Sequence, residues 1–281
     1  MNRHDAVVRF RALHDAGCFV LPNPWDVGTA LHLAHLGFQA LATTSAGFAF
    51  SRGLPDDPAA LPCDGVLAHV REIVQATPLP VNADFQSGYA DTPEGVADSV
   101  ARCVGTGCAG LSIEDASGDP AAPLFPIDVA LARLRAAREA IDASRVPVVL
   151  TARCEAWLVG VPAPFSMARE RLAAYAAAGA DCLYAPGFHK REDVAALVEA
   201  VAPKPVNVLM STPGGLTVAD LAALGVRRIS VGSTLARVAW GAFMRAARQI
   251  AGEGRFDLFA DAVPYPEIDG FFRDDRRRRG S

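Results

Sequence analysis

Short apolar runs alternate with longer Ala- and Leu-rich segments along nearly the whole chain, and this alternation limits the folds open to it. Short runs of this kind are typical of buried strands, whereas the longer segments have the pattern of helices. Eight β-α units in 281 residues predict a single α/β domain, a (β/α)8 TIM barrel. The runs lie at residues 18–23, 40–44, 81–85, 110–114, 147–153, 182–185, 206–209 and 228–231.

A doubly wound open sheet is the alternative arrangement of the same units. That fold carries a Gly-x-Gly-x-x-Gly turn after its first strand, where this chain has Asn23-Pro24-Trp25-Asp26. Helix boundaries support the alternation, since Thr92-Pro93 places a capping residue before a first-turn proline. No Pro- or Ser-rich linker divides the chain. We therefore expect one barrel domain over residues 1–255 and a C-terminal extension over residues 256–281.

Composition excludes several classes of protein. A chain with 51% hydrophobic and 21% charged residues suits one large soluble core, and a net charge of -4 gives no overall attraction for nucleic acid. No signal peptide or membrane-length apolar segment is present, so we expect a cytoplasmic protein without a membrane partner. The six cysteines lack Cys-x-x-Cys spacing and suit reduced thiols. The Arg-rich residues 273–279 are expected to form a solvated, mobile end.

Two acidic residues close neighbouring apolar runs, Asp84 after residues 81–83 and Glu114 after residues 110–113. Parallel strands place both carboxylates at the same end of the barrel. Hard divalent cations prefer oxygen ligands, and Mg²⁺ takes one or two protein carboxylates while keeping several waters. The pair therefore predicts a metal-dependent active site. The alternative is that each acid caps the helix that follows it.

Other strand ends carry further candidates. Arg153 follows the fifth run, where its planar guanidinium could hold a substrate carboxylate, although an ion pair with Glu155 or another strand-end acid is the alternative. Small residues around Gly47 would let backbone N–H groups approach an oxyanion. Trp25 could line the pocket or pack in the core, and Asp56 could serve only to shape a turn.

Taken together, these motifs resemble the isocitrate lyase and phosphoenolpyruvate mutase superfamily. The resemblance runs in order over about residues 13–251. The motifs that carry it are Pro22-Asn23-Pro24-Trp25-Asp26, Thr44-Ser45-Ala46-Gly47, Gly53-Leu54-Pro55-Asp56, Asp84-Phe85-Gln86-Ser87-Gly88-Tyr89, Ser112-Ile113-Glu114-Asp115 and Ala152-Arg153-Cys154-Glu155.

The resemblance implies a (β/α)8 barrel whose last helix is exchanged between subunits of a homotetramer, a dimer of dimers. It also implies a Mg²⁺ cofactor, with Mn²⁺ as an alternative, and a small carboxylic acid substrate that reacts through an enolate. Asp84 matches the acid that ligates the metal directly, and Glu114 and Asp56 match acids that hold metal-bound water. Arg153 matches the arginine that grips the substrate carboxylate. The substrate's oxo-acid end would lie against the backbone of Ala46, Gly47 and Phe48, with Trp25 and Ser45 alongside.

Two departures from the superfamily pattern narrow the expected activity. Gln86 replaces a carboxylate of the metal motif, so we expect weaker cation binding rather than none. Residues 115–126 contain no Cys, Lys or His, whereas isocitrate and methylisocitrate lyases have Lys-Lys-Cys-Gly-His there and phosphoenolpyruvate mutase has Lys-Thr-Asn-Ser. Cys154 cannot replace the missing thiol, because it follows Arg153 on a strand and points away from it.

We therefore expect a Mg²⁺-dependent lyase that cleaves a carbon–carbon bond of a small 2-hydroxy or 2-oxo carboxylic acid. Tyr89 and Tyr184 are candidates for the general acid or base, and each could equally be a packing residue. Two alternatives stay open. One is a phosphonate or carboxyphosphonate mutase or hydrolase of the same superfamily, and the other is a barrel that binds an oxo acid without turnover.

Overall fold

The computed structural model describes residues 3–280 of the chain. It contains eight parallel strands, and each lies within two residues of a predicted run at both ends. The prediction of eight β-α units is confirmed. The strands are β1 (Phe19–Leu21), β2 (Leu41–Ala42), β3 (Val81–Asp84), β4 (Gly110–Glu114), β5 (Val149–Arg153), β6 (Cys182–Tyr184), β7 (Val206–Leu209) and β8 (Arg228–Ser230).

The strands form a closed ring rather than an open sheet. Ladders join them in the order β1-β8-β7-β6-β5-β4-β3-β2, so β1 and β2 lie at the two ends of this order. A backbone hydrogen bond from the N–H of Ala42 to the carbonyl of Pro22, 3.0 Å long, joins these ends. The fold is therefore a (β/α)8 barrel, and the doubly wound alternative is wrong.

The side chain of Asn23 strengthens this junction between β1 and β2, where the ring of strands closes. Its Nδ2 donates to the carbonyl of Thr43 beside β2 at 3.0 Å. Its Oδ1 accepts from the N–H groups of Val231 and Gly232, just after β8, at 3.0 and 2.9 Å. One buried amide thus connects the ends of three neighbouring strands.

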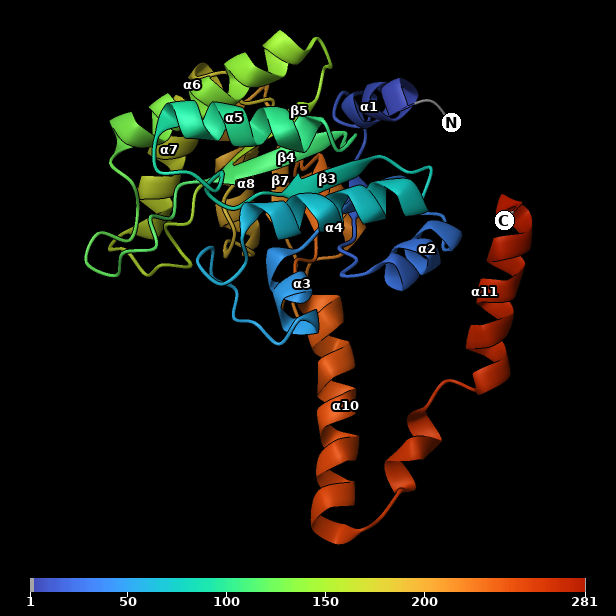
Figure 1. The fold of residues 1–281 in the computed structure, drawn as a ribbon. Helices are drawn as coiled ribbons and strands as arrows, with labels where there is room; N and C mark the ends of the chain where they lie inside the picture. The colour runs from blue at the N-terminus through green and yellow to red at the C-terminus, as the bar shows by residue number, and fades with distance from the viewer. Residues whose placement is uncertain (1–2, 281) are drawn as a thin grey trace. The chain divides into compact units, whose positions relative to one another are not determined.

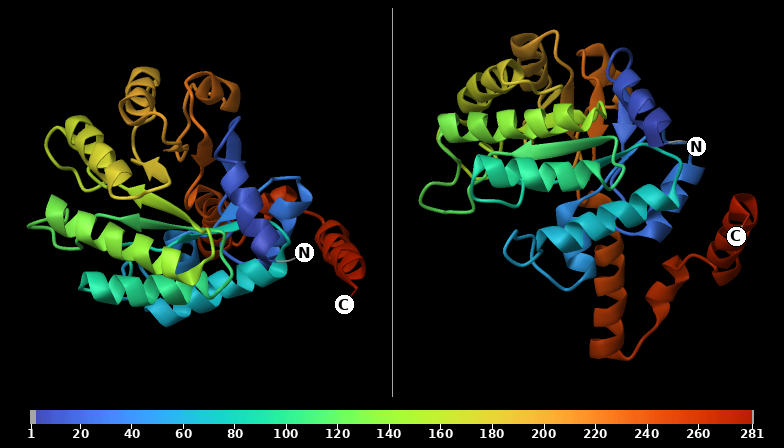
Figure 2. Two further views of the ribbon diagram at one scale, coloured as in Figure 1. Left: turned by 90° about the horizontal axis from the view of Figure 1, so that it is seen from above. Right: turned by 45° about the horizontal axis from the view of Figure 1, so that its top comes forward.

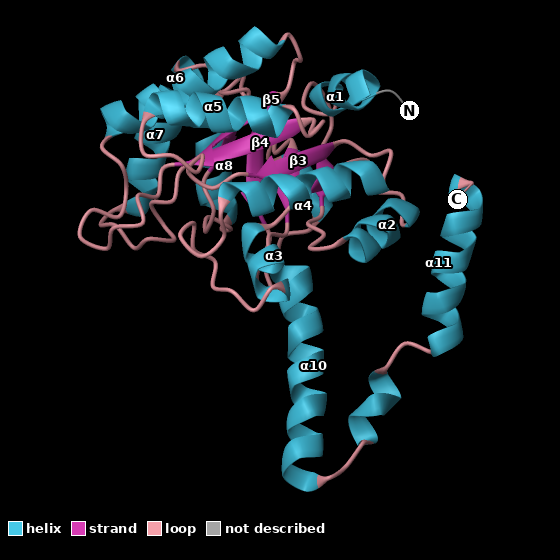
Figure 3. Cartoon of the chain, viewed as in Figure 1, coloured by secondary structure: helices cyan, strands magenta, loops and turns pink. Residues whose placement is uncertain are grey.

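Helices surround the ring of strands, which forms the inner layer (Figures 1, 2 and 3). Thr92 caps the helix that was expected after Asp91, and its side chain accepts from the N–H of Gly95 at 3.2 Å. The barrel helices are α1 (Arg3–Ala12), α2 (Val27–His35), α3 (Ser45–Ser51), α4 (Cys63–Ala76), α5 (Pro93–Val104), α6 (Ile127–Ser144), α7 (Pro164–Ala177), α8 (Arg191–Val201) and α9 (Val218–Ala223).

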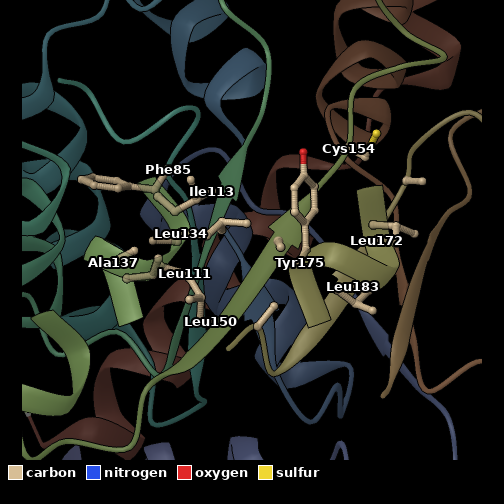
Figure 4. Packing of buried hydrophobic residues seen from close by; sticks show 14 of the residues in the cluster. Phe85, Leu111, Ile113, Leu134, Ala137, Leu150, Cys154, Leu172, Tyr175 and Leu183 are labelled. Carbon is tan, nitrogen blue, oxygen red and sulfur yellow. The ribbon is translucent and has the colours of Figure 1, made fainter. Parts of the chain in front are cut away.

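Side chains along each strand point alternately outward, to the hydrophobic core between strands and helices, and inward, to the barrel interior. Leu111 and Ile113 of β4 belong to the buried cluster that packs against Leu134 of α6 and Leu172 of α7 (Figure 4). Because successive strand side chains point to opposite faces, the intervening positions face inward. On β4 and β5 these inward positions end at Glu114 and Arg153, whose Cα atoms are register partners.

Helix α1 closes the N-terminal end of the barrel. Phe10 is fully buried and belongs to a cluster with Phe19 of β1 and Val149 of β5. A Cβ added to Gly110 of β4 would lie 2.6 Å from the Phe10 ring and 2.6 Å from Oδ1 of Asn82, so only glycine fits there. Access to the interior is therefore restricted to the carboxyl ends of the strands.

The chain forms two compact units, the first ending at Thr234 and the second beginning at Leu235. The second unit contains most of α10 (Thr234–Glu253), then η1 (Asp257–Asp261) and α11 (Tyr265–Arg279). Its exposed large apolar side chains are Leu235, Val238, Trp240, Phe243, Met244, Phe256, Phe259, Val263, Tyr265, Ile268 and Phe272.

The Arg-rich end of the chain is helical. It lies in α11, where Arg273 pairs with Asp269 and Arg279 with Asp275, each at 2.7 Å and one helical turn apart. All six cysteines are free, as expected, and four of them are buried. Of the helices within residues 3–280, none combines the length and apolarity that spanning a bilayer requires.

Candidate active site

Arg153 lies among acidic side chains at the carboxyl ends of the strands. Its Nη1 is 3.2 Å from Oε2 of Glu114 and 3.5 Å from Oδ1 of Asp84, and its Nε donates to Oε1 of Glu155. The structure thus brings together the three residues that the sequence singled out at the ends of β3, β4 and β5. The ion pairs anticipated as an alternative role for Arg153 are present as well.

Nη2 of Arg153 differs from its other nitrogen atoms. In the described part of the chain it donates no hydrogen bond. The guanidinium also lies over the ring of Tyr184, with its central carbon 5.2 Å from the ring centroid. Surrounding groups therefore fix the orientation of the guanidinium while one of its nitrogen atoms stays available to a ligand.

Acids outnumber bases in this cluster. Burial raises the pKa of Glu114 well above its usual value and also raises that of Glu155, and in each case Arg153 only partly offsets the effect. Burial, followed by the charge of Asp84, raises the pKa of Asp56. Burial lowers the pKa of Arg153, but Glu155, Glu114 and Asp84 outweigh it and raise that pKa overall. The cluster therefore favours additional positive charge.

Gln86 connects the loop after β3 to the loop that carries Asp56. Its Nε2 donates to Oδ1 of Asp56 at 3.1 Å, and its Oε1 is buried with no hydrogen-bond partner within residues 3–280. Gln86 has φ +43°, a left-handed conformation that is uncommon outside glycine. The amide of Gln86 is therefore turned toward Asp56, and its side-chain oxygen accepts no hydrogen bond from the described residues.

Residues after β2 hold Asp84 from the other side. Oδ2 of Asp84 accepts from both the N–H and Oγ of Ser45, each at 2.9 Å. The N–H of Gly47 donates to Oγ1 of Thr44 at 3.2 Å, and that of Phe48 to the Thr44 carbonyl at 3.0 Å, so both amides serve the start of α3. Substrate binding by Ala46, Gly47 and Phe48 stays a prediction.

Four further aromatic and sulfur-bearing candidates have distinct environments. Trp25 is half-buried, and its contact with a substrate stays a prediction. The hydroxyl of Tyr89 is buried without a partner in the described chain, and burial together with Asp84 raises its pKa. Burial raises the pKa of Tyr184 to about 12, so this phenol is protonated at neutral pH. Cys154 is buried in the hydrophobic cluster outside the barrel interior (Figure 4).

Residues 115–126 form a hairpin-like loop whose base is fixed by a buried ionic cluster. Ala116 and Leu124 form a β-bridge, and the N–H of Ser117 donates to the Pro123 carbonyl at 3.0 Å. Oδ2 of Asp115 accepts from Nη1 of Arg171 at 3.0 Å and from the hydroxyl of Tyr175 at 2.6 Å.

Oδ1 of the same Asp115 side chain accepts from the N–H of Glu155 at 2.8 Å. Asp115 therefore links the loop to the residue that pairs with Nε of Arg153. Sequence reasoning missed this role and that of Glu155 as a site residue. Only the motif positions of Asp115 and Glu155, one and two residues after the end of a strand, offered any indication of it.

A small polar cavity lies inside the barrel below this cluster. Its volume is about 50 Å³, and its lining includes Asp84, Arg153, Asn82, Ser112, Asn207 and Arg228. Such a space admits a few atoms of a ligand rather than a whole cofactor. A substrate would therefore lie mainly above it, at the mouth of the barrel.

A metal site is not preassembled in this arrangement. Among residues 3–280, no three His, Cys, Asp or Glu side chains are grouped closely enough to hold an ion by themselves. Nη1 of Arg153 instead lies between Asp84 and Glu114.

Comparison with known proteins identifies the family. The phosphoenolpyruvate phosphomutase family pattern matches residues 10–251, which is most of the chain. The chain belongs to this family. It is thus a member of the isocitrate lyase and phosphoenolpyruvate mutase superfamily, which includes lyases and mutases, and the resemblance inferred from its motifs is confirmed.

Similar proteins cover between 80% and 96% of this chain. An uncharacterized protein of Mycobacterium tuberculosis is 36% identical over 92% of this chain and 94% of its own. Oxaloacetate decarboxylase of Chromohalobacter salexigens is 30% identical over 80% of this chain and 78% of its own. The crystal structure of a Burkholderia cenocepacia protein, provisionally described as a lyase/mutase, is 46% identical, with a TM-score of 0.91 and 96% of each chain covered.

Proposed function

We propose that this family member is a lyase that breaks a carbon–carbon bond of a small 2-hydroxy or 2-oxo carboxylic acid and leaves an enolate as one product. The observation that carries the proposal is the cluster of Asp84, Glu114 and Arg153 at the carboxyl ends of β3, β4 and β5. In a (β/α)8 barrel this face holds the active site. The cluster combines a carboxylate-binding cation with surplus acids that suit a divalent metal.

Arg153 would bind the substrate carboxylate. Its Nη2 donates no hydrogen bond in the described chain, while Nε and Nη1 are held by Glu155, Glu114 and Asp84. A charge-assisted hydrogen bond from a guanidinium already held in place loses little conformational entropy on binding. Tyr184, protonated at neutral pH because its pKa is raised to about 12, can donate a hydrogen bond but cannot act as a base there.

The residues present fit a divalent cation. Asp56, Asp84 and Glu114 supply hard oxygen donors, and the buried Oε1 of Gln86 has no other partner within residues 3–280. The raised pKa values of Asp56 and Glu114 show that the cluster disfavours its own negative charge, which a cation would neutralise. Mg²⁺ bound by these groups would supply Lewis acidity toward the charge that develops on the substrate.

The choice of a carbon–carbon lyase has support from one relative and from the loop. The name of the Chromohalobacter salexigens enzyme describes removal of a carboxyl group from oxaloacetate, a 2-oxo dicarboxylic acid. The loop of residues 115–126 carries no thiol to protonate a leaving enolate, so isocitrate and 2-methylisocitrate should be poor substrates. A phosphonate mutase of the same family is the second candidate, favoured by the family match itself.

A substrate panel tests the proposal. The purified protein with Mg²⁺ is assayed against oxaloacetate, malate derivatives, the two isocitrates and phosphonopyruvate. Pyruvate or another oxo acid formed from a carbon substrate supports the lyase, and phosphorus-containing products support the mutase. No turnover of any member, together with binding of oxalate or pyruvate, would indicate a binding protein instead.

Metal binding is tested separately by calorimetric titration of chelator-treated protein with Mg²⁺ or Mn²⁺. The parent should bind the cation, and Asp84→Ala should bind it much more weakly because the most direct ligand is lost. Absence of binding by the parent, even with oxalate present, would refute the metal site.

A further inference from the structure

A buried arginine on α6, Arg133, lines the same small pocket as Glu114 and has no ion-pair partner among the described residues. Arg133 is 1% exposed, and no carboxylate lies within ion-pairing distance of it in the described part of the chain. Burying an unpaired cation is costly, and burial lowers its pKa. A residue of this kind needs compensating hydrogen bonds.

Backbone carbonyls provide those hydrogen bonds, all from the loop after β3. Nη2 of Arg133 donates to the carbonyls of Ser87 and Ala90, each at 2.7 Å, and Nη1 donates to the carbonyl of Asp91 at 3.1 Å. The planar guanidinium thus forms hydrogen bonds with three carbonyls within residues 87–91, the segment immediately after Gln86. An ammonium group offers no comparable planar fork.

The loop needs such support because its backbone is strained. Gln86 has φ +43° and Tyr89 has φ +53°, so two residues with a Cβ adopt the left-handed region within four positions. Conformations of this kind persist only where surrounding contacts determine them. The carbonyls held by Arg133 lie between and just after these two residues.

The same guanidinium reaches the loop of residues 115–126. Its central carbon lies 4.4 Å from the ring centroid of Phe125, a cation–π contact. The Phe125 carbonyl accepts from Nη2 of Arg171 at 2.9 Å, and its N–H donates to the Asp115 carbonyl at 2.9 Å. Phe125 is therefore fixed at the base of its loop and packs on Arg133.

We propose that Arg133 is a positioning residue that holds the loop of residues 85–91 in its strained conformation and couples it to the loop of residues 115–126 through Phe125. It touches no reacting atom. Its effect on ligand binding passes through Gln86, which the loop turns toward Asp56. The affinity part of this inference rests on the proposed metal site, whereas the structural coupling does not.

Hydrogen–deuterium exchange measured on the full chain tests the coupling. Arg133→Met keeps an apolar stem of similar length, and Arg135→Met, at an exposed position of the same helix, is the matched control. Arg133→Met should speed exchange in peptides covering residues 85–91 and 115–125 and leave the strand peptides β4 to β7 unchanged. Arg133→Lys, which keeps the charge, should rescue only part of the protection.

Mg²⁺ titration of the same variants supplies the second readout. Partners that orient metal ligands typically change affinity about 10- to 100-fold, so Arg133→Met should weaken binding by that factor while Arg135→Met matches the parent. Faster exchange throughout the barrel, or in the first loop alone, would overturn the coupling. Unchanged affinity in Arg133→Met would overturn the proposed effect of Arg133 on ligand binding. If the parent binds no Mg²⁺, the proposed function fails while the exchange comparison still decides the coupling.

Discussion

Gln86 donates a hydrogen bond to Asp56 over 3.1 Å, and its own side-chain oxygen is buried without a partner in residues 3–280. By resemblance, this amide stands at the position of a superfamily carboxylate. Because an amide is neutral and can donate, it can approach Asp56 without repulsion. The contact shows how the site accommodates the substitution that was apparent from the sequence.

Gln86→Glu should tighten cation binding and destabilise the metal-free protein. Two unit charges about 4 Å apart interact by about 4 kcal/mol at an effective dielectric constant of about 20, so the new carboxylate repels Asp56 until a cation neutralises both. We expect Mg²⁺ to bind about tenfold more tightly or more. Compared with the parent, the variant should have a lower melting temperature in chelator and a larger rise in melting temperature when Mg²⁺ is added. Gln86→Met, which lacks both polar atoms, should bind more weakly than the parent. Unchanged affinity in Gln86→Glu would mean that position 86 does not face the metal.

Arg153 should be essential for both activity and the charge balance of the site. Arg153→Lys keeps the charge but loses the planar grip, so we expect kcat/KM to fall about 10- to 100-fold on any substrate found. Arg153→Ala should lose more activity and about 3–5 kcal/mol of stability, because Glu114 and Glu155 would be left buried without their cation. Steady-state kinetics and urea unfolding measure the two effects. Full activity in Arg153→Ala would refute its role in binding the substrate carboxylate.

His69 should make the protein sensitive to acid. It is buried, its Nε2 has no partner in the described chain, and its ring stacks on Phe48 with centroids 3.9 Å apart. Burial lowers its pKa from 6.5 to about 4. At a pH between these two pKa values, His69 is protonated in the unfolded chain and neutral in the folded chain. The free energy of unfolding therefore falls as pH drops, by up to about 1.4 kcal/mol per pH unit.

His69→Phe keeps the stacked ring and removes the titrating group. Urea unfolding at pH 7 and pH 5 should show a smaller loss of stability for the variant than for the parent. Stability at pH 7 should be equal or higher, because an unsatisfied buried nitrogen is gone. Equal losses in the two proteins would show that His69 does not stay neutral in the folded state.

The second unit should mediate self-association. Its exposed apolar side chains include Val238, 65% exposed, and Phe243, 60% exposed, on α10. Exposed apolar area of this extent favours burial against another chain, and by family resemblance we expect a homotetramer. Light scattering at micromolar concentration should show it, and Phe243→Asp should give smaller species while Arg71→Glu, on the exposed face of α4, should not. A monomeric parent would contradict the assembly.

The alternation of strands and helices could be predicted from sequence because each element has a local pattern. The strand-end residues Asp84, Glu114 and Arg153 could be predicted to meet for the same reason, since parallel strands present their ends on one face. The predicted strands extended up to two residues beyond the observed ones, because the sequence pattern does not mark the residue at which strand pairing stops.

Contacts between residues distant in sequence could not be predicted in this way. Asp115 binds the side chain of Tyr175, 60 positions away, and Arg133 binds the carbonyl of Ser87, 46 positions away. Nothing local distinguishes Arg133 from Arg135 and Arg138 on the same helix. Their partners depend on how α6 and α7 dock on the barrel, which no short segment encodes.

The hydrogen bond from Ala42 to Pro22, together with the Asn23 side chain, has a consequence for behaviour outside the active site. A sheet with two free edges offers unpaired backbone groups on which another chain can add as a strand, and this is a common route to aggregation. Here the two terminal strands are joined to each other, although β2 contributes only two residues to the ring. If this junction opened, it would expose both edges at once and turn the barrel into a template for aggregation.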